Sequence, residues 1–370
     1  MIKEFPILKG IHYLDNAATT QKPDVVIESV KNYYLKYNAN MHRGIYELSE
    51  ISTELFEQSR NKLKEFFNAK RVIFSSGATQ AFNDLSRFFK NKKALVLEIE
   101  HHSNYLPWFS NCKAEVLKLK DFENESFLDK ISKFDVISFT MMSNVSGYMP
   151  NLEIIKKIKE KNPDIYVVLD ACQYAPHKRI DFEKIGADFI VFSSHKMYGP
   201  LGVGIILANE RIDELEPYTL GGGMLLELDK WKESPYKFEA GSQNGEAIYG
   251  FLKAIEYLEK DFDSKIKKEQ ELTKYLVESL RKENVKVIGH DKENFGPVVS
   301  FVLEFHPHDV SSFAAKNNVC IRAGHHCAKP YMKLLGVDAT SRASVSFYNT
   351  KEDIHALIES IKNIRSVLNG

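Results

Sequence analysis

The stretch DFIVFSSHKMYGPLGVGIIL, residues 188–207, indicates both the fold class and the place of the functional site. An apolar run of strand length enters a polar turn, passes through Gly and Pro, and continues into a second apolar run. The turn holds Ser193, Ser194, His195 and Lys196. Because ligands of open α/β sheets bind at the carboxyl ends of strands, a lysine here is placed where a Schiff base could form. An ordinary surface lysine in a turn is the alternative.

Short apolar runs of the same kind recur upstream, at 71–74 (RVIF), 94–99 (ALVLEI), 135–140 (DVISFT) and 165–170 (IYVVLD). Between several of them lie helical patterns such as LEIIKKIKEK, 152–161, with Lys and Glu on the outer face. Alternating strand and helix signals predict an α/β layer with a mostly parallel sheet.

The pattern changes after about residue 245. Residues 246–283 predict a helical stretch. After it come predicted strands near 298–304, 319–322 and 342–347 and a closing helix at 351–368. These elements indicate a second, smaller α+β domain. We predict a large α/β domain over 21–255, and a small domain that combines 1–20 with 256–370 and carries the Cys327 loop.

The composition is ordinary for a globular protein. Of 370 residues, 44% are hydrophobic and 27% are charged, and 50 Lys+Arg balance 50 Asp+Glu. This balance argues against a general electrostatic mode of binding to nucleic acid or to anionic membranes. The sequence has no apolar run of the ~18–20 residues that a membrane-spanning helix needs, and its start lacks the apolar core of a signal peptide. Four cysteines in so long a chain do not suggest a disulfide framework, so we expect free thiols and a cytoplasmic protein.

Asp170 ends a predicted strand in VVLDACQY, 167–174. A buried carboxylate needs a partner. The pyridinium nitrogen of pyridoxal 5′-phosphate (PLP) would be one, because that charged pair keeps the ring an electron sink. A helix cap or an ordinary salt bridge is the alternative.

FSSGATQAFND, 74–84, turns from a strand into a helix through small residues, Gly77, Ala78 and Thr79. Such a turn offers backbone N–H groups to a phosphate. Neither G-x-x-x-x-G-K-[ST] nor G-x-G-x-x-G occurs, so nucleoside triphosphate and dinucleotide sites lose support.

EIEHHSNYLPW, 98–108, places His101 and His102 just after a strand. One of them could stack on a flat cofactor ring and shuttle protons near neutral pH. Hydrogen-bonded turn histidines are the alternative.

RAGHHCAKP, 322–330, brings Arg322, His325, His326 and Cys327 into one loop after an apolar strand. Next to His and Arg, the pKa of a thiol can fall below its reference value of about 8.5, which makes it a better nucleophile. A zinc site would need paired ligands elsewhere, and no second Cys/His pair supplies them, so we predict no metal. Arg342, at the start of another strand, could clamp a substrate carboxylate or form a structural salt bridge.

Taken in this order, these segments resemble the PLP-dependent class V aminotransferase family, and within it the Suf-type cysteine desulfurase and selenocysteine lyase branch. The similarity runs from YLDNAATT, 13–20, to SRASVSFYNT, 341–350, nearly the whole chain. The densest matches are MHRGIYELS, EHHSNYLPW, FSSHKMYGPLGVGIIL, FEAGSQN and RAGHHCAKP. A short, His-rich cysteine loop is typical of the Suf type. The resemblance implies PLP-dependent transferase fold type I, with a mostly parallel seven-stranded sheet in the large domain.

The resemblance also implies roles for individual residues. Lys196 would hold PLP as a Schiff base, Asp170 would pair with the ring nitrogen, and Gln173 would hydrogen-bond the ring hydroxyl. His101 would stack on the ring, and Cys327 would be the nucleophile. Phosphate binding falls to Gly77, Ala78, Thr79, Ser193, His195 and, from the other subunit of a homodimer, Ser242. Arg342 would bind the substrate, with His42, Arg43 and Arg322 around the site. Asn144, near the ring, would contact both the cofactor and the substrate.

Three features depart from the family pattern. Ala78 stands where a phosphate-binding threonine is common, Gln80 replaces a usual glutamate, and the segment between Met224 and Phe238 is short. The first departure bears on cofactor retention. The last bears on which partner accepts the sulfur, because in the family this region lies beside the partner's active site.

The predicted function is a cysteine desulfurase that converts L-cysteine to L-alanine and leaves a persulfide on Cys327. A second thiol, on an acceptor protein or a small molecule, would collect the sulfur for iron–sulfur cluster assembly or other sulfur metabolism. Cysteine, selenocysteine and cysteine sulfinate all stay open as substrates. Another class V reaction, such as transamination, would use Lys196 but not Cys327. A scaffold that only binds a partner is the non-enzymatic alternative.

Overall fold

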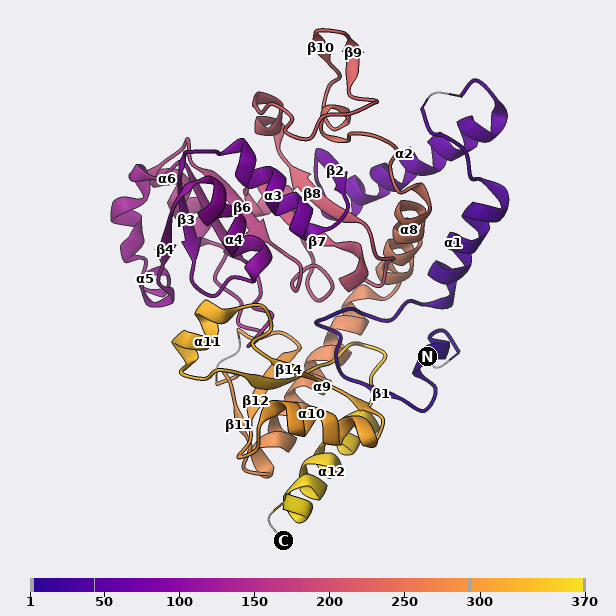
Figure 1. The fold of residues 1–370 in the computed structure, drawn as a ribbon. Helices are drawn as coiled ribbons and strands as arrows, with labels where there is room; N and C mark the ends of the chain where they lie inside the picture. Colours follow the sequence, from indigo (N-terminus) through magenta and orange to yellow (C-terminus); the bar gives the residue numbers. More distant parts are fainter. Residues whose placement is uncertain (1–2, 43, 292–293, 369–370) are drawn as a thin grey trace.

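The computed structural model describes residues 3–42, 44–291 and 294–368. Its centre is a seven-stranded sheet (Figure 1). The strands are β2 (Arg71–Ser75), β3 (Lys93–Leu97), β4 (Lys113–Leu117), β5 (Val136–Thr140), β6 (Tyr166–Asp170), β7 (Phe189–Ser193) and β8 (Gly204–Ala208). They lie in the order β2-β8-β7-β6-β5-β3-β4, and only β8 runs antiparallel to its neighbours. The predicted mostly parallel seven-stranded sheet is confirmed.

Burial explains which strands were visible in the sequence. Every residue of β5, β7 and β8 is buried, as in sheets covered on both faces, so each strand is a continuous apolar run. Strand β4 lies at the edge of the sheet and is mostly exposed, and it has no such run. The sequence analysis missed this strand for that reason.

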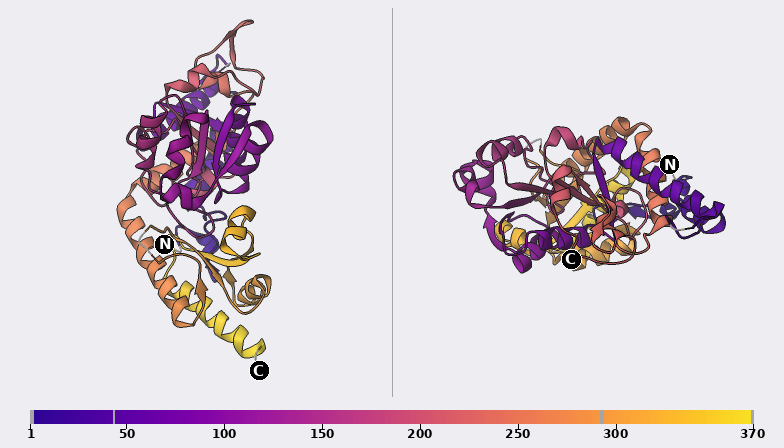
Figure 2. Two further views of the ribbon diagram at one scale, coloured as in Figure 1. Left: turned by 90° about the vertical axis from the view of Figure 1, so that its left-hand side faces the viewer. Right: turned by 90° about the horizontal axis from the view of Figure 1, so that it is seen from above.

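Helices cover both faces of the sheet (Figures 1 and 2). They are α1 (Asp24–Lys36), α2 (Glu47–Phe67), α3 (Ala78–Phe88), α4 (His102–Asn111), α5 (Leu119–Glu123), α6 (Ile154–Lys161), α7 (Phe182–Ile185) and α8 (Gly245–Glu259). The helical stretch predicted over 246–283 is in fact two helices, α8 and α9 (Phe262–Lys282). The helix breaks before Phe262 because Asp261 adopts a left-handed conformation with φ of 57°.

The C-terminal part forms a second, four-stranded antiparallel sheet in the order β11-β12-β15-β14. Its strands are β11 (Lys286–Val287), β12 (Val298–Val302), β14 (Arg322–Gly324) and β15 (Thr340–Ser344). Strand β15 begins and ends earlier than the predicted 342–347. The helices are α10 (Pro307–Lys316), α11 (Lys329–Leu335) and α12 (Lys351–Leu368). The short strand β1 (His12–Tyr13) pairs in parallel with β13 (Val319–Cys320), which joins the N-terminal segment to this part.

Buried apolar side chains form two separate clusters. The larger surrounds the seven-stranded sheet, and the smaller packs α9 and α12 against the second sheet through residues such as Leu276, Phe301 and Leu357. Two cores support the proposed division into a large and a small domain, whose boundaries stay a prediction. Within the described ranges, no helix is both long and apolar enough to cross a bilayer.

A hairpin of β9 (Leu225–Glu227) and β10 (Lys230–Trp231) projects from the body at the top of Figure 1. Its tip is apolar and exposed, since Leu226 is 60% and Leu228 is 97% accessible. The segment that follows is anchored by a buried ion pair, in which two nitrogens of Arg60 in α2 each donate to one oxygen of Glu239 at 2.8 Å. The same carboxylate accepts from the backbone N–H of Phe74 in β2.

We predict that Glu239→Ala lowers the free energy of unfolding by about 3 kcal/mol, because the buried Arg60 charge loses its bidentate partner and keeps only Glu57 at 3.1 Å, and the backbone N–H of Phe74 loses its acceptor. Urea unfolding at one fixed protein concentration measures the change. Glu359→Ala is the matched control, since Glu359 pairs with Lys362 on the surface, and it should cost at most about 1 kcal/mol. Equal losses in the two variants would contradict the prediction.

Candidate active site

A cavity of about 230 Å³ opens at the carboxyl ends of β5, β6 and β7. Thr140, Asp170 and Ser193, the last residues of these strands, all line it. The second sheet and its loops close it from the other side through Arg322, His326, Cys327 and Arg342. Most of the residues that the sequence singled out therefore meet here: Ala78, Thr79, His101, Asn144, Asp170, Gln173, Ser193, His195, Lys196, Arg322, Cys327 and Arg342. Gly77 lies next to Ala78, at the N-cap of α3.

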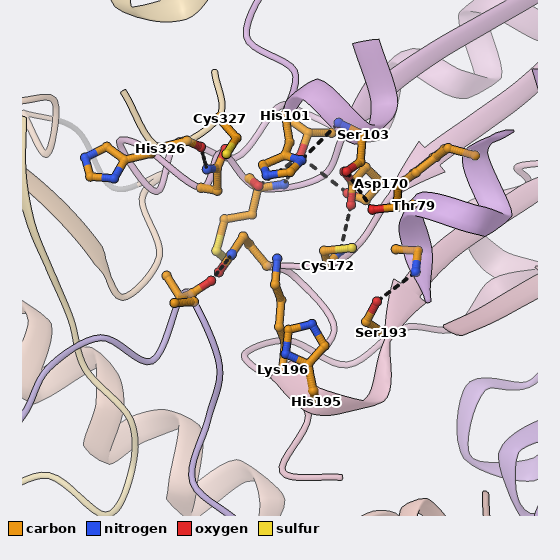
Figure 3. A pocket seen from close by; sticks show the side chains of 18 of the residues that line it. Thr79, His101, Ser103, Asp170, Cys172, Ser193, His195, Lys196, His326 and Cys327 are labelled. Atoms are coloured by element: carbon orange, nitrogen blue, oxygen red, sulfur yellow. Dashed lines mark hydrogen bonds between the residues drawn. The ribbon is translucent and has the colours of Figure 1, made fainter. Parts of the chain in front are cut away.

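The turn after β7 directs Lys196 into this cavity. The carbonyl of His195 accepts hydrogen bonds from the backbone N–H of Thr20 at 3.2 Å and from the amine of Lys22 at 2.9 Å. The Lys196 amine extends into the space lined by His101 and Cys172 (Figure 3). No hydrogen bond of that amine is found among the described residues. Lys22, whose pKa burial lowers to about 7, was missed because nothing local in the sequence marks its contact with the turn.

Asp170 lies in the wall of the cavity and is buried. One carboxylate oxygen accepts from the backbone N–H of Cys172 at 2.9 Å, and burial raises the pKa of the group. No α-helix begins at Asp170, and no ion pair to it occurs in the described part of the chain, so neither structural alternative holds. Gln173 donates through its side chain to the carbonyl of Ala17 at 2.7 Å.

The N-terminus of α3 lies on the opposite side of the cavity from Cys327 (Figure 3). The backbone N–H of Ala78 donates to the Ser193 hydroxyl at 2.9 Å, and the hydroxyls of Thr79 and Ser103 lie 2.8 Å apart. A helix N-terminus with three hydroxyls around it suits a phosphate. The sequence analysis missed Ser103, which lies on α4, a different helix from Thr79.

A glycine is required where β8 begins behind this turn. A Cβ on Gly204 would lie 2.4 Å from the carbonyl carbon of Gly77, so no other residue lets the strand approach the turn.

The two neighbouring histidines after β3 have different surroundings. His101 caps α4, and its Nδ1 accepts from the backbone N–H of Ser103 at 3.1 Å, which leaves the proton on Nε2. Burial lowers the pKa of His101 to about 3, so the ring that lines the cavity is neutral near pH 7. The ring of His102 instead contacts the Cys327 loop.

Arg342 is buried at the end of the cavity near the second sheet. It donates to the carbonyl of Asn144 at 2.9 Å and to the carboxylate of Asp15 at 3.0 Å. Its Nε has no partner among the described residues although it is buried. The structure therefore shows a salt bridge and, on the same guanidinium, a free donor for an anionic ligand.

The Cys327 loop is held in an unusual backbone conformation. His326 and Cys327 both have left-handed φ angles, 50° and 54°. The Asn144 side chain donates to the His326 carbonyl at 2.7 Å, and the His326 ring is hydrogen-bonded to Thr340 at 2.9 Å. Burial lowers the pKa of His326 to about 2, so this ring is neutral. This ring therefore supplies no charge that would favour a thiolate, whereas the guanidinium groups of Arg322 and Arg342 line the same cavity as cations.

Ser242 and His42 do not line this cavity in their own chain. They line a second hollow of about 390 Å³, together with Asn40, Met41, Gly222, Gly223, Lys232, Tyr236, Glu239, Gly241 and Gln243. Arg43 lies outside the described residues. In the same described ranges, no three His, Cys, Asp or Glu side chains come together as a metal site.

Comparison with known proteins places the chain in a family. The model of the aminotransferase class V family matches residues 12–357. The chain belongs to this family. A probable cysteine desulfurase of Staphylococcus aureus is 36% identical over 99% of this chain and 96% of its own length, and one of Halalkalibacterium halodurans is 35% identical over 98% and 97%.

Solved structures of cysteine desulfurases have the same fold. The apo cysteine desulfurase of Thermococcus onnurineus superimposes with a TM-score of 0.93 at 32% identity, covering 99% of this chain and 98% of its own. The Escherichia coli cysteine desulfurase CsdA, in an S-sulfonic acid form, gives 0.89 at 27% identity, covering 99% and 97%. The fold is therefore that of the type I PLP enzymes, as predicted.

The cavity fits PLP, the cofactor of this class V chain. PLP has an aldehyde, a ring nitrogen and a phosphate, and each needs a different neighbour. The cavity offers the primary amine of Lys196, the buried carboxylate of Asp170, and the helix N-terminus with the Ser193 hydroxyl. Ala78 lacks the hydroxyl of the usual threonine, but its backbone N–H still points to Ser193.

We predict that iodoacetamide at pH 8 alkylates Cys327 first in the folded protein. Cys327 lies half-buried at the cavity. Burial raises the pKa of Cys172 well above its ordinary value and that of Cys112 to about 12, so both hold little reactive thiolate at pH 8. Peptide mass spectrometry over time gives the order of labelling, and unfolding in urea should bring the rates together. Faster labelling of Cys172 or Cys112 in the folded protein would contradict the described burial.

Proposed function

We propose that this chain is a PLP-dependent cysteine desulfurase, which takes the sulfur of L-cysteine onto Cys327 and releases L-alanine. The observation that carries the proposal is that Lys196 and Cys327 line one cavity. Arg342 lines the same cavity, and its Nε has no partner among the described residues. An aminotransferase needs the lysine but has no use for the thiol. The names of the most similar relatives support the same activity.

Lys196, Asp170 and the α3 turn would hold the cofactor. The lysine amine would bind its aldehyde carbon, Asp170 would keep its ring nitrogen protonated, and Thr79, Ser193 and His195 would bind its phosphate. When bound, PLP withdraws electrons from the carbon that carries the substrate amino group and makes its proton acidic. The amine of Lys196 would be the base that takes this proton. The neutral ring of His101 would cover the face of the cofactor.

Arg342 and Cys327 would act on the substrate itself. The Nε of Arg342 would bind the substrate carboxylate, while the carbonyl of Asn144 and the carboxylate of Asp15 hold the guanidinium in place. The Cys327 thiolate then attacks the substrate sulfur. A sulfur–sulfur bond forms, the carbon–sulfur bond breaks, and its electron pair stays with the substrate carbon, which takes a proton to become alanine. The sulfur remains on Cys327 as a persulfide.

A homodimer would complete the site. Ser242 and His42 lie together, yet away from the cavity of their own chain. The tip of the nearby hairpin exposes the apolar side chains of Leu226 and Leu228, which a second subunit would cover. We propose that Ser242 reaches the phosphate in the partner subunit, and that His42 lies at the rim of that site.

The physiological setting follows from the same activity. We propose a cytoplasmic enzyme that passes the persulfide sulfur to an acceptor thiol, on a protein or on a small molecule, for iron–sulfur cluster assembly or related sulfur metabolism. Neither nucleic acid nor a membrane is proposed as a partner. L-cysteine is the proposed substrate, and selenocysteine and cysteine sulfinate are the alternative substrates.

We predict that Lys196→Ala remains folded but loses both turnover and covalent cofactor. Borohydride treatment of the PLP-loaded wild type, followed by peptide mapping, should place the reduced label on Lys196, because a Schiff base needs a primary amine in the cavity. Lys22→Ala is the control, since this second lysine beside the turn donates to the His195 carbonyl and should keep the label on Lys196. A label on Lys22 or on any other lysine would contradict the assignment.

We predict that Cys327→Ser still binds PLP and cysteine but releases sulfide at least about a hundredfold more slowly, because only a thiolate can take the sulfur as a persulfide. Sulfide and alanine are measured with and without a reductant, and mass spectrometry should find one added sulfur on the Cys327 peptide. Cys112→Ser is the control and should keep most activity, because its thiol donates to the carbonyls of Ser86 and Phe89 away from the cavity. Full sulfide release by Cys327→Ser, or a transamination product instead of alanine and sulfide, would overturn the desulfurase function.

A further inference from the structure

His102 lies between the wall that would hold the cofactor and the loop that carries Cys327. It is the first residue of α4 and directly follows His101, whose ring lines the cavity. Two consecutive residues therefore contact different parts of the site: His101 lines the cavity, and His102 contacts the Cys327 loop. The sequence alone is compatible with a role of this histidine pair toward the cofactor or within the turn, and in the structure the two residues have different contacts.

Three contacts join His102 to the loop. Its backbone N–H donates to the carbonyl of Cys327 at 2.6 Å. Its ring Nε2 accepts from the backbone N–H of Lys329 at 3.1 Å, the first residue of α11. Its ring also lies beside that of His325, with centroids 5.7 Å apart, and Nδ1 of His325 accepts from the backbone N–H of Cys327 at 3.1 Å.

These contacts satisfy the backbone groups on both sides of the thiol. The carbonyl and the N–H of Cys327 and the N–H of Lys329 are all bound to one of the two histidines. The left-handed region is strained for a non-glycine residue, and His326 and Cys327 adopt it in succession. Such a loop persists only where the surrounding contacts determine it. The contacts of His102 and His325 with the loop, here called the clamp, therefore set where the thiol points.

The geometry points to His102 as a positioning residue for the desulfurase reaction: its ring holds the Cys327 loop against the cofactor wall so that the thiol faces the substrate sulfur. The inference rests on the proposed function. His102 does not touch the cavity itself, because the residues lining it include His101 and Ser103 on either side but not His102. Its effect is therefore on the thiol and not on the binding of PLP.

The protonation of the ring agrees with this role. Nε2 accepts a hydrogen bond from a backbone N–H, so the ring proton lies on Nδ1. Burial, followed by the nearby His325 and Lys329, lowers the pKa of His102. The neutral form that can accept from Lys329 is thus the one favoured near pH 7.

Two variants test the ring contact, and both keep the backbone N–H. His102→Phe preserves the bulk but removes the acceptor, whereas His102→Gln restores an acceptor at the position of Nε2. We expect His102→Phe to lower kcat for sulfide release by about three- to tenfold, the effect of one lost hydrogen bond. PLP content and the absorbance change on adding cysteine should match those of the wild type. Iodoacetamide should alkylate Cys327 about threefold faster or more, because the loop is released.

His102→Gln should return both the turnover and the alkylation rate to within about twofold of the wild type. His355→Phe is the matched control, because this exposed histidine is on α12, where its ring is hydrogen-bonded to Tyr275, and it should change neither quantity. Unchanged alkylation and turnover in His102→Phe would overturn the inference, as would loss of PLP without any change at Cys327, or a His102→Gln variant as impaired as His102→Phe. The proposed function fails separately, through full activity of Cys327→Ser, while the alkylation rate of His102→Phe still reports on the clamp.

Discussion

One buried guanidinium joins the parts of the molecule from which the site is built. Arg342 belongs to the second sheet, its carboxylate partner Asp15 to the N-terminal segment, and its carbonyl partner Asn144 to the loop after β5 of the large sheet. A charge removed from water must be paired and hydrogen-bonded or it destabilises the fold. The three segments are therefore held in one arrangement around this side chain. Its Nε, which has no partner among the described residues, is left as a donor for a ligand.

Asn144 extends this arrangement to the nucleophile. Its carbonyl accepts from Arg342, and its side chain donates to the carbonyl of His326, so a single residue of the loop after β5 contacts both the cation and the cysteine loop. The family resemblance implied a role for Asn144 toward both the cofactor and the substrate. Its contacts in the structure are with Arg342 and the Cys327 loop, although it also lines the cavity.

The electrostatics of the cavity depend on burial more than on the number of histidines. Burial lowers the pKa of His101 to about 3, that of His195 to about 4 and that of His326 to about 2, so these rings are neutral. The guanidinium groups of Arg322 and Arg342 lie at one end of the cavity, and the positive partial charge of the α3 N-terminus lies at the other. Such a cavity favours a ligand with anionic groups at both ends, such as an amino acid joined to a phosphorylated cofactor.

The sequence by itself determined the central sheet and the chemistry at the ends of its strands. Strands β5, β7 and β8 are buried throughout, so their apolar runs are continuous, and a polar residue such as Asp170 or Lys196 at the end of a run stands out. The family resemblance added the roles of these residues and of Cys327. Only the tertiary structure decided the edge strand β4, the helix break at Asp261, and the contacts of Ser103, Lys22 and His102. Periodicity reports burial along a continuous element, whereas these features depend on exposure at an edge, on a single backbone angle, or on hydrogen bonds between residues far apart in the chain.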